Sequence, residues 1–437
     1  MAGDDSHVGG RWMYLNIPYQ IAYGPVSSLI ILYILDLNGT VIDASYAISL
    51  SYVALIFAGL FWGKLIDTYN RRRLFIALSF FGLAGSLAAL YMLRSIPLVV
   101  LAYGVLSFMV AANATPINLL VMETGPRERW AESFSKLQML MSIGGMAGFV
   151  FVTVLSGFMG IGVVLLLLVP FAVAALLMTS MVKEPARPLG RRAIMSSMHA
   201  LSSRLMTLHT FFVGRKMVRR AEDYAKRTLA GMTHMPAPTN LNMLYAAALL
   251  FSVSGVLFNT AYPAGMRHIG LDNFQVLMVL LVGMVVQTMA FYHSGMLAER
   301  HTKMRVAVSS MSIRGLAYIV MAAGFVIAGS TGNFGLGFIM YPLAAGLAYA
   351  LFYTAFNTML FESLGSERRG RKLGMYSAIT AVGSLAGALL AGYVSYYIGY
   401  WLSFTVAGAL ALLTGYVVFM MPRFDRPSDA QVPAGKA

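Results

Sequence analysis

The sequence predicts an all-α integral membrane protein with 12 transmembrane helices in two six-helix repeats. Three observations predict this class: a high apolar content, apolar runs of membrane-spanning length along the chain, and local patterns that recur in the second half. Apolar residues make up 58% of the 437 positions and charged residues only 11%, against about 25% charged in soluble domains. So little polar surface excludes an ordinary water-soluble enzyme.

Each apolar stretch is about 20 residues or longer, enough for a helix to cross a hydrocarbon core of roughly 30 Å. Continuous apolar runs favour helices over a β-barrel, whose strands alternate over about ten residues. The polar start and the length of the first span argue against a cleavable signal peptide. We expect spans near 14–36, 45–66, 74–93, 98–121, 133–157, 161–182, 241–264, 273–297, 306–328, 333–360, 373–398 and 401–421.

The formal net charge of +15 follows from the topology of the chain. When the N-terminus is placed inside, all of the 32 Lys and Arg residues are cytoplasmic except Arg94, Arg267 and Arg314. This bias is typical of a multi-pass protein with both termini in the cytoplasm. We therefore expect a monomer in the cell membrane, with the lipid bilayer and a small solute as partners and no nucleic acid.

A long polar segment divides the chain into two halves. We expect an N-terminal six-helix bundle over 1–182, a cytoplasmic basic amphipathic linker over 183–239, a C-terminal six-helix bundle over 240–421 and a cytoplasmic tail over 422–437. Basic amphipathic helices tend to lie in the headgroup plane, so the linker is expected to rest on the inner leaflet. A regulatory role for the linker is the alternative.

Two local patterns occur twice at nearly constant spacing. The first pairs Gly63 with Gly295 and Asp67 with Glu299, and both pairs are 232 residues apart. The second pattern is displaced by 239 residues in every member: Glu123, Arg129, Gly144 and Gly148 return as Glu362, Arg368, Gly383 and Gly387. We interpret these ordered sets as a tandem duplication of six helices. The paired glycines are expected where helix backbones pack closely in lipid.

At these motifs the sequence resembles the major facilitator superfamily of secondary transporters. The stretch from Gly63 to Arg73 is similar to the family signature between helices two and three, and Glu362 to Gly370 resembles its pattern after helix ten. The resemblance implies transport of a small organic solute by alternating access, without enzymatic activity or a cofactor. Span five lacks the Gly-Pro pair associated with exporters, so the direction of transport stays open.

The charged motifs are expected to form a conformational latch that exists in one transporter state and breaks in the other. The resemblance places Asp67 against the start of span eleven, where a helix dipole favours a carboxylate. The alternative is that these charges only anchor helix ends. The predicted latch residues are Gly63, Asp67, Arg71, Glu123, Arg129, Gly295, Glu299, Lys303, Glu362 and Arg368.

Spans one, four, seven and ten line the central cavity in the family, and here they carry polar side chains and several prolines. Polar groups that face lipid are costly, so we expect these side chains to face a wet cavity. The alternative is that they tie helices together. The candidate cavity residues are Tyr19, Gln20, Tyr23, Asn113, Asn259, Tyr349, Tyr353 and Asn357.

All 17 Asp and Glu residues fall in loops or near span ends, so the predicted wall is neutral and favours an uncharged or amphipathic solute. His293 is the candidate proton site because imidazole exchanges protons near neutral pH; a structural hydrogen bond is the alternative. Arg314 is expected to snorkel or to pair with a neighbouring helix, although binding of an anionic solute is a further option.

The sequence lacks the motifs of several other classes of protein. There is no Gly-x-x-x-x-Gly-Lys-Ser/Thr pattern for ATP, and the absence of cysteine and of dense His clusters predicts no metal site. An intramembrane enzyme would need paired carboxylates or His clusters at the interface. A receptor or assembly factor without transport, and a proton-coupled drug exporter, remain the alternatives to a carrier.

Replacing Asp67 by Asn is expected to favour the inward-open state and to slow transport, because it removes the charge that the helix dipole holds. The chain contains no cysteine, so labelling of single introduced cysteines can report the population of each state. Unchanged labelling would contradict the latch.

Overall fold

The computed structural model describes residues 11–69, 71–124, 130–182, 240–300, 302–331, 335–363 and 369–421, and every regular element in these ranges is helical. Twelve of the helical stretches are long and apolar enough to cross a membrane. The predicted all-α class with 12 spans is therefore confirmed. The predicted linker over 183–239 and tail over 422–437 lie outside the described residues.

The first six spans are helical, and three of them are interrupted. In order, they are η2 (Arg11–Leu15), α1 (Asn16–Tyr23) and α2 (Val26–Asp36); α3 (Val41–Tyr69); α4 (Arg72–Met92); α5 (Ile96–Val110), η3 (Ala111–Asn113) and α6 (Ala114–Thr124); α7 (Trp130–Ser156); and α8 (Ile161–Leu167), α9 (Val169–Met178) and η5 (Thr179–Met181).

The last six spans are more regular, and only the tenth changes its helical type. They are α12 (Asn240–His268); α13 (Asn273–Arg300); α14 (Lys303–Thr331); α15 (Gly335–Tyr341), the π-helical η7 (Pro342–Ala348) and α16 (Tyr349–Ser363); α17 (Arg369–Tyr397); and α18 (Tyr400–Phe419).

The interruptions of the first half fall in spans one, four and six, while α3, α4 and α7 are each a single helix. Three of the four spans that were predicted to line the cavity are interrupted: spans one, four and ten. Pro25 follows the break between α1 and α2 and removes a backbone donor there. Pro342 begins the π-helical turn. The seventh span, α12, carries Pro263 inside a helix that is not interrupted.

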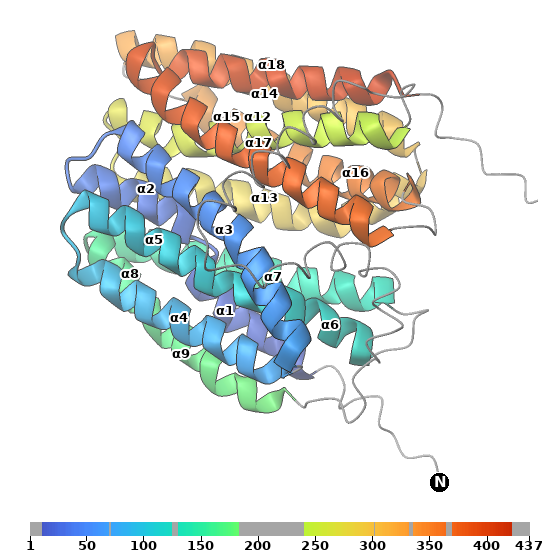
Figure 1. The fold of residues 1–437 in the computed structure, drawn as a ribbon. Coiled ribbons are helices and arrows are strands. Elements are labelled where there is room, and N and C mark those ends of the chain that lie inside the picture. Colours follow the sequence, from blue (N-terminus) through green and yellow to red (C-terminus); the bar gives the residue numbers. More distant parts are fainter. Residues whose placement is uncertain are drawn as a thin grey trace, which may run out of the picture.

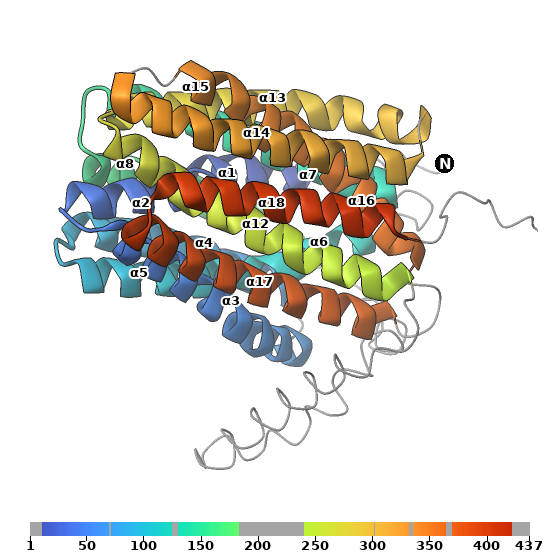
Figure 2. The same cartoon turned by 90° about the horizontal axis from the view of Figure 1, so that it is seen from above.

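The helices of the two halves pack in the same pairwise pattern. Span one packs on span five (α1 on α7), and span seven packs on span eleven (α12 on α17). Span three packs on span six (α4 on α9), and span nine packs on span twelve (α14 on α18). In Figure 1 the first half, blue to green, lies below the second half, yellow to red. The halves meet where α3 lies beside α17 and α7 lies beside α13, as Figures 1 and 2 both show.

Glycines allow the closest helix crossing in each half. A Cβ atom on Gly144 or Gly148 would lie 2.6 Å from a backbone oxygen of α1, that of Ile17 or Ile21. In the second half, a Cβ atom on Gly383 would lie 3.0 Å from the oxygen of Leu249, and one on Gly387 would lie 2.5 Å from that of Val253. Both contacted pairs, 17 with 249 and 21 with 253, are 232 residues apart in the sequence. The same crossing is therefore built twice, as the duplication predicts.

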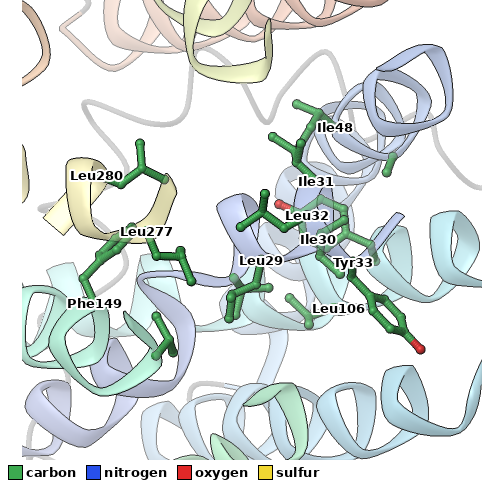
Figure 3. Close-up of a cluster of buried hydrophobic side chains, with 14 of the residues drawn as sticks. Leu29, Ile30, Ile31, Leu32, Tyr33, Ile48, Leu106, Phe149, Leu277 and Leu280 are labelled. Carbon is green, nitrogen blue, oxygen red and sulfur yellow. The ribbon is translucent and has the colours of Figure 1, made fainter. Parts of the chain in front are cut away.

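The described apolar core is continuous between the halves at one end only. One cluster of buried side chains includes residues of both halves, and Figure 3 shows Phe149 of α7 close to Leu277 of α13 within it. Two smaller clusters each stay within one half. One surrounds Trp62 in the first half, and the other surrounds Phe352 in the second. Both smaller clusters lie toward the ends of the spans that carry the predicted latch.

Replacing Gly387 by Ala is expected to lower the melting temperature, because the new methyl group would meet the backbone oxygen of Val253. Overpacking of this kind costs about 1–3 kcal/mol. Gly85→Ala in α4 is the matched control, since nothing lies within 4 Å of a Cβ atom at Gly85 and alanine favours a helix by about 1 kcal/mol. Thermal unfolding in detergent checks both variants, and equal melting temperatures would contradict the close crossing.

Candidate functional site

In the first half, the predicted cavity residues of spans one and four lie together. The ring of Tyr19 stacks on those of Tyr23 and Phe80, with centroids 5.6 Å and 5.0 Å apart. Asn113, in the short η3 turn of span four, lies beside the Tyr19 hydroxyl. The Oδ1 atom of Asn113 is buried without a hydrogen-bond partner. Tyr19 and Asn113 are buried and Tyr23 is half-buried, so this polar group lies inside the helix bundle.

In the second half, the predicted residues of span ten form an aromatic face on α16. Tyr349 stacks on Tyr353 at 5.7 Å, and Phe291 of α13 meets Tyr353 edge-on at 6.0 Å. The side-chain amide of Asn357 donates to the backbone oxygen of Tyr353 at 2.8 Å. Tyr353 contacts Phe291 of α13 and lies near Tyr376 of α17, and it is still 40% exposed. The face therefore has open space beside it.

Tyr52 of α3 lies between these two groups and was not among the predicted cavity residues. It lies near Tyr23 in the first half and near Tyr349 in the second, and its hydroxyl lies beside Ser384 of α17. The expectation considered only spans one, four, seven and ten. A tyrosine in the middle of span two was the signal that could have found it, because a buried hydroxyl in lipid needs a polar neighbour.

Two predicted cavity residues do not join the aromatic groups by any described contact. Gln20 is half-buried, and its Cβ atom lies at the glycine crossing with Gly144. Asn259 is exposed on α12. Their predicted role at the cavity stays a prediction.

Of the two expectations for Arg314, snorkelling is wrong, and contact with neighbouring helices is confirmed, because the guanidinium lies over the rings of Phe251 in α12 and Tyr349 in α16. Arg314 is only 2% exposed, so it does not reach the end of the span. Its Nε donates to the hydroxyl of Tyr318 on its own helix at 2.8 Å. Sequence reasoning assumed a peripheral ninth span, whereas α14 directs this cation toward α12 and α16.

His293 lies near the end of its span rather than in the middle. Its helix α13 continues to Arg300, and the imidazole is exposed and meets the ring of Tyr292 edge-on at 5.0 Å. No described hydrogen bond links His293 to the tyrosines of the central region. Its role as a proton site stays a prediction.

The described part of the latch contains one ion pair. Lys303 donates to a carboxylate oxygen of Glu362, which joins α14 and α16 within the second half. Arg71 is exposed at the start of α4, and Gly63 lies in α3 with open space around it. The remaining members have side chains or backbones outside the described residues: Asp67, Glu123, Arg129, Gly295, Glu299 and Arg368.

A second set of polar contacts joins the halves at the opposite end of the spans. Asp36, at the end of α2, pairs with Arg267 at 3.2 Å and accepts hydrogen bonds from the Asn273 amide at 2.9 Å and 3.1 Å. The hydroxyls of Tyr46 and Tyr393 hydrogen-bond to each other at 2.7 Å. Sequence reasoning missed these contacts because no motif marks residues that lie more than 200 positions apart.

A further contact between the halves lies at mid-span. The mid-span contact joins the hydroxyls of Ser142 and Thr288 at 2.9 Å. These polar contacts between the halves thus lie at the end where one apolar cluster includes both halves, or at mid-span. No group of three metal-ligating side chains occurs among the described residues.

This architecture has clear counterparts among known proteins. The family model of the Major Facilitator Superfamily matches residues 15–232 and 244–437, so the chain belongs to this family, whose fold is that of transporters. None of the curated proteins compared with the chain matches it.

Three solved structures share the fold over almost their whole length. A variant of the nucleoside transporter NupG is 14% identical with a TM-score of 0.70, and the match covers 95% of this chain and 100% of that one. The D-xylose-proton symporter is 13% identical with a TM-score of 0.68, covering 95% and 97%. The xylose transporter XylE from E. coli, in a partially occluded inward-open conformation, is 12% identical with a TM-score of 0.66, covering 96% and 99%.

Replacing Arg267 by Gln is expected to open the end at which Asp36 lies. A partly exposed ion pair contributes about 0.2–1 kcal/mol, so the population should shift by no more than about fivefold. A cysteine introduced at Ser45, which is buried against Gly392 of α17, is expected to react faster with a thiol reagent. Arg94→Gln is the control, since Arg94 is exposed at the same end and contacts only its own half. Equal labelling in the two variants would contradict a role of the ion pair between Asp36 and Arg267 in closing this end.

Proposed function

We propose that this protein is a secondary carrier that moves a small organic solute across the cell membrane by alternating access. The observation that carries the proposal is the asymmetry of the contacts between the halves. One apolar cluster spans both halves at the end near Asp36, while the clusters around Trp62 and Phe352 stay separate. A carrier alternates between two states, in which its two halves pack together at one end of the spans or at the other. Halves that share an apolar core at one end only are what one of these states requires.

The proposed solute site is the central group of tyrosines. Tyr52 of span two lies near Tyr23 of span one in the first half and near Tyr349 of span ten in the second, and Tyr353 stacks on Tyr349. Aromatic rings offer large apolar faces, and their hydroxyls offer hydrogen bonds. When the halves move, a site that both halves form becomes accessible from the other side of the membrane. Binding of the solute is then coupled to the movement of the halves.

The proposed orientation follows the positive charges. With both termini in the cytoplasm, the end that carries Asp36 faces outward, and the structure corresponds to an inward-facing state. The partners in this proposal are the lipid bilayer and the solute, with the protein acting as a monomer and without nucleic acid. Proton coupling through His293 is a further option that transport measurements can separate.

Purified protein in proteoliposomes is expected to take up at least one labelled solute from a panel that includes uridine, xylose and 4-hydroxyphenylacetate. Tyr353→Ala is expected to lower that uptake by about tenfold, equivalent to about 1.4 kcal/mol, because it removes an exposed ring of the proposed site. Tyr416→Ala is the matched control, since Tyr416 is 54% exposed on α18.

Uptake is measured with and without a pH gradient. A rate that follows the gradient identifies proton coupling, and a rate that ignores it identifies facilitated transport. Binding of a solute without any uptake would instead favour a receptor and contradict the carrier.

A further inference from the structure

Arg314 is a buried cation without a counter-charge in the described part of the chain. The side chain is 2% exposed, and no described Asp or Glu lies within ion-pair distance. Its Nη1 group is buried and has no hydrogen-bond partner. Arginine does not release its proton in proteins, so this charge is permanent, and a buried unpaired charge is costly.

Three aromatic rings enclose the guanidinium. Its central carbon lies 5.0 Å from the ring centre of Phe251, 5.4 Å from that of Tyr318 and 5.4 Å from that of Tyr349. The negative faces of these rings compensate part of the positive charge. They supply no acceptor for Nη1, so the compensation is incomplete.

Tyr349 is the ring of the proposed solute site that lies against Arg314. Tyr349 touches the guanidinium on one side and stacks on the exposed Tyr353 on the other. Tyr349 is half-buried, and no described hydrogen bond holds its hydroxyl. Its ring can therefore turn without breaking a hydrogen bond.

The duplication indicates that Arg314 is not part of the shared scaffold. The spacing of 232 residues that relates the two halves pairs Arg314 with Gly82 of α4. There the space beside the helix is filled by Met109, whose Cβ atom would lie 2.6 Å from a Cβ atom on Gly82. The first half thus packs this position with an apolar side chain, while the second half keeps a cation.

We propose that Arg314 sets the charge class of the solute, and that the solute is an aromatic monocarboxylate. The inference rests on the proposed carrier function. The carboxylate accepts a hydrogen bond from Nη1 once the ring of Tyr349 turns aside, and it brings the missing negative charge. The flat apolar body then packs on Tyr353 and Phe291. One unpaired cation matches one carboxylate, which distinguishes the solute from a dicarboxylate.

The test compares 4-hydroxyphenylacetate with its uncharged amide on the purified full-length protein. We expect the carboxylate to raise the melting temperature in a saturable manner and the amide to bind at least tenfold more weakly. Arg314→Gln is expected to weaken carboxylate binding by at least tenfold. Arg94→Gln removes an equal charge from an exposed loop and is expected to leave binding unchanged. Arg314→Lys keeps the charge and is expected to keep the preference for the carboxylate.

Equal binding of the acid and the amide would overturn the inference, as would full carboxylate binding by Arg314→Gln. If Arg314→Gln does not fold, the acid and amide pair on the unaltered protein and on Arg314→Lys decides the question. Uptake of xylose or uridine without a carboxylate preference would overturn this inference and leave the proposed function intact. A protein that takes up no solute at all would contradict both.

Discussion

Close backbone contact at two helix crossings is the constraint on which the rest of the structure depends. Lipid tails are as apolar as leucine, so helices in a membrane associate through packing and polar contacts rather than through the hydrophobic effect. Gly144 and Gly148 bring α7 onto α1, and Gly383 and Gly387 bring α17 onto α12. Each half is held together by such a crossing.

The seam between the halves is built from contacts of modest strength. Near Asp36 it combines an apolar cluster with one partly exposed ion pair, whose side chains are 31% and 25% exposed. Exposed pairs contribute little to stability. A conformational equilibrium that a ligand can shift must not be biased by more than a few kcal/mol, and contacts of this kind suit that requirement.

Sequence reasoning could predict the features that depend on local periodicity. The 12 spans follow from apolar runs, and the glycine crossings follow from the repeated spacing. The pairing of Tyr349 with Tyr353 follows from their separation of four residues on one helix. The contact between Asp36 and Arg267 and the surroundings of Arg314 could not be predicted in this way, because they depend on how each helix is rotated about its own axis. Neighbours that are distant in the sequence set that rotation.

The π-helical turn at Pro342–Ala348 has a consequence for how span ten can change. A π-helical turn accommodates an additional residue compared with an α-helical one, so deleting one residue there would restore an ordinary helix. Because the π-helical turn absorbs the extra residue, α16 would keep its rotation after the deletion, and Tyr349 would stay beside the guanidinium of Arg314. A change in length within this turn would thus alter the wall of span ten and leave the aromatic face of α16 in place.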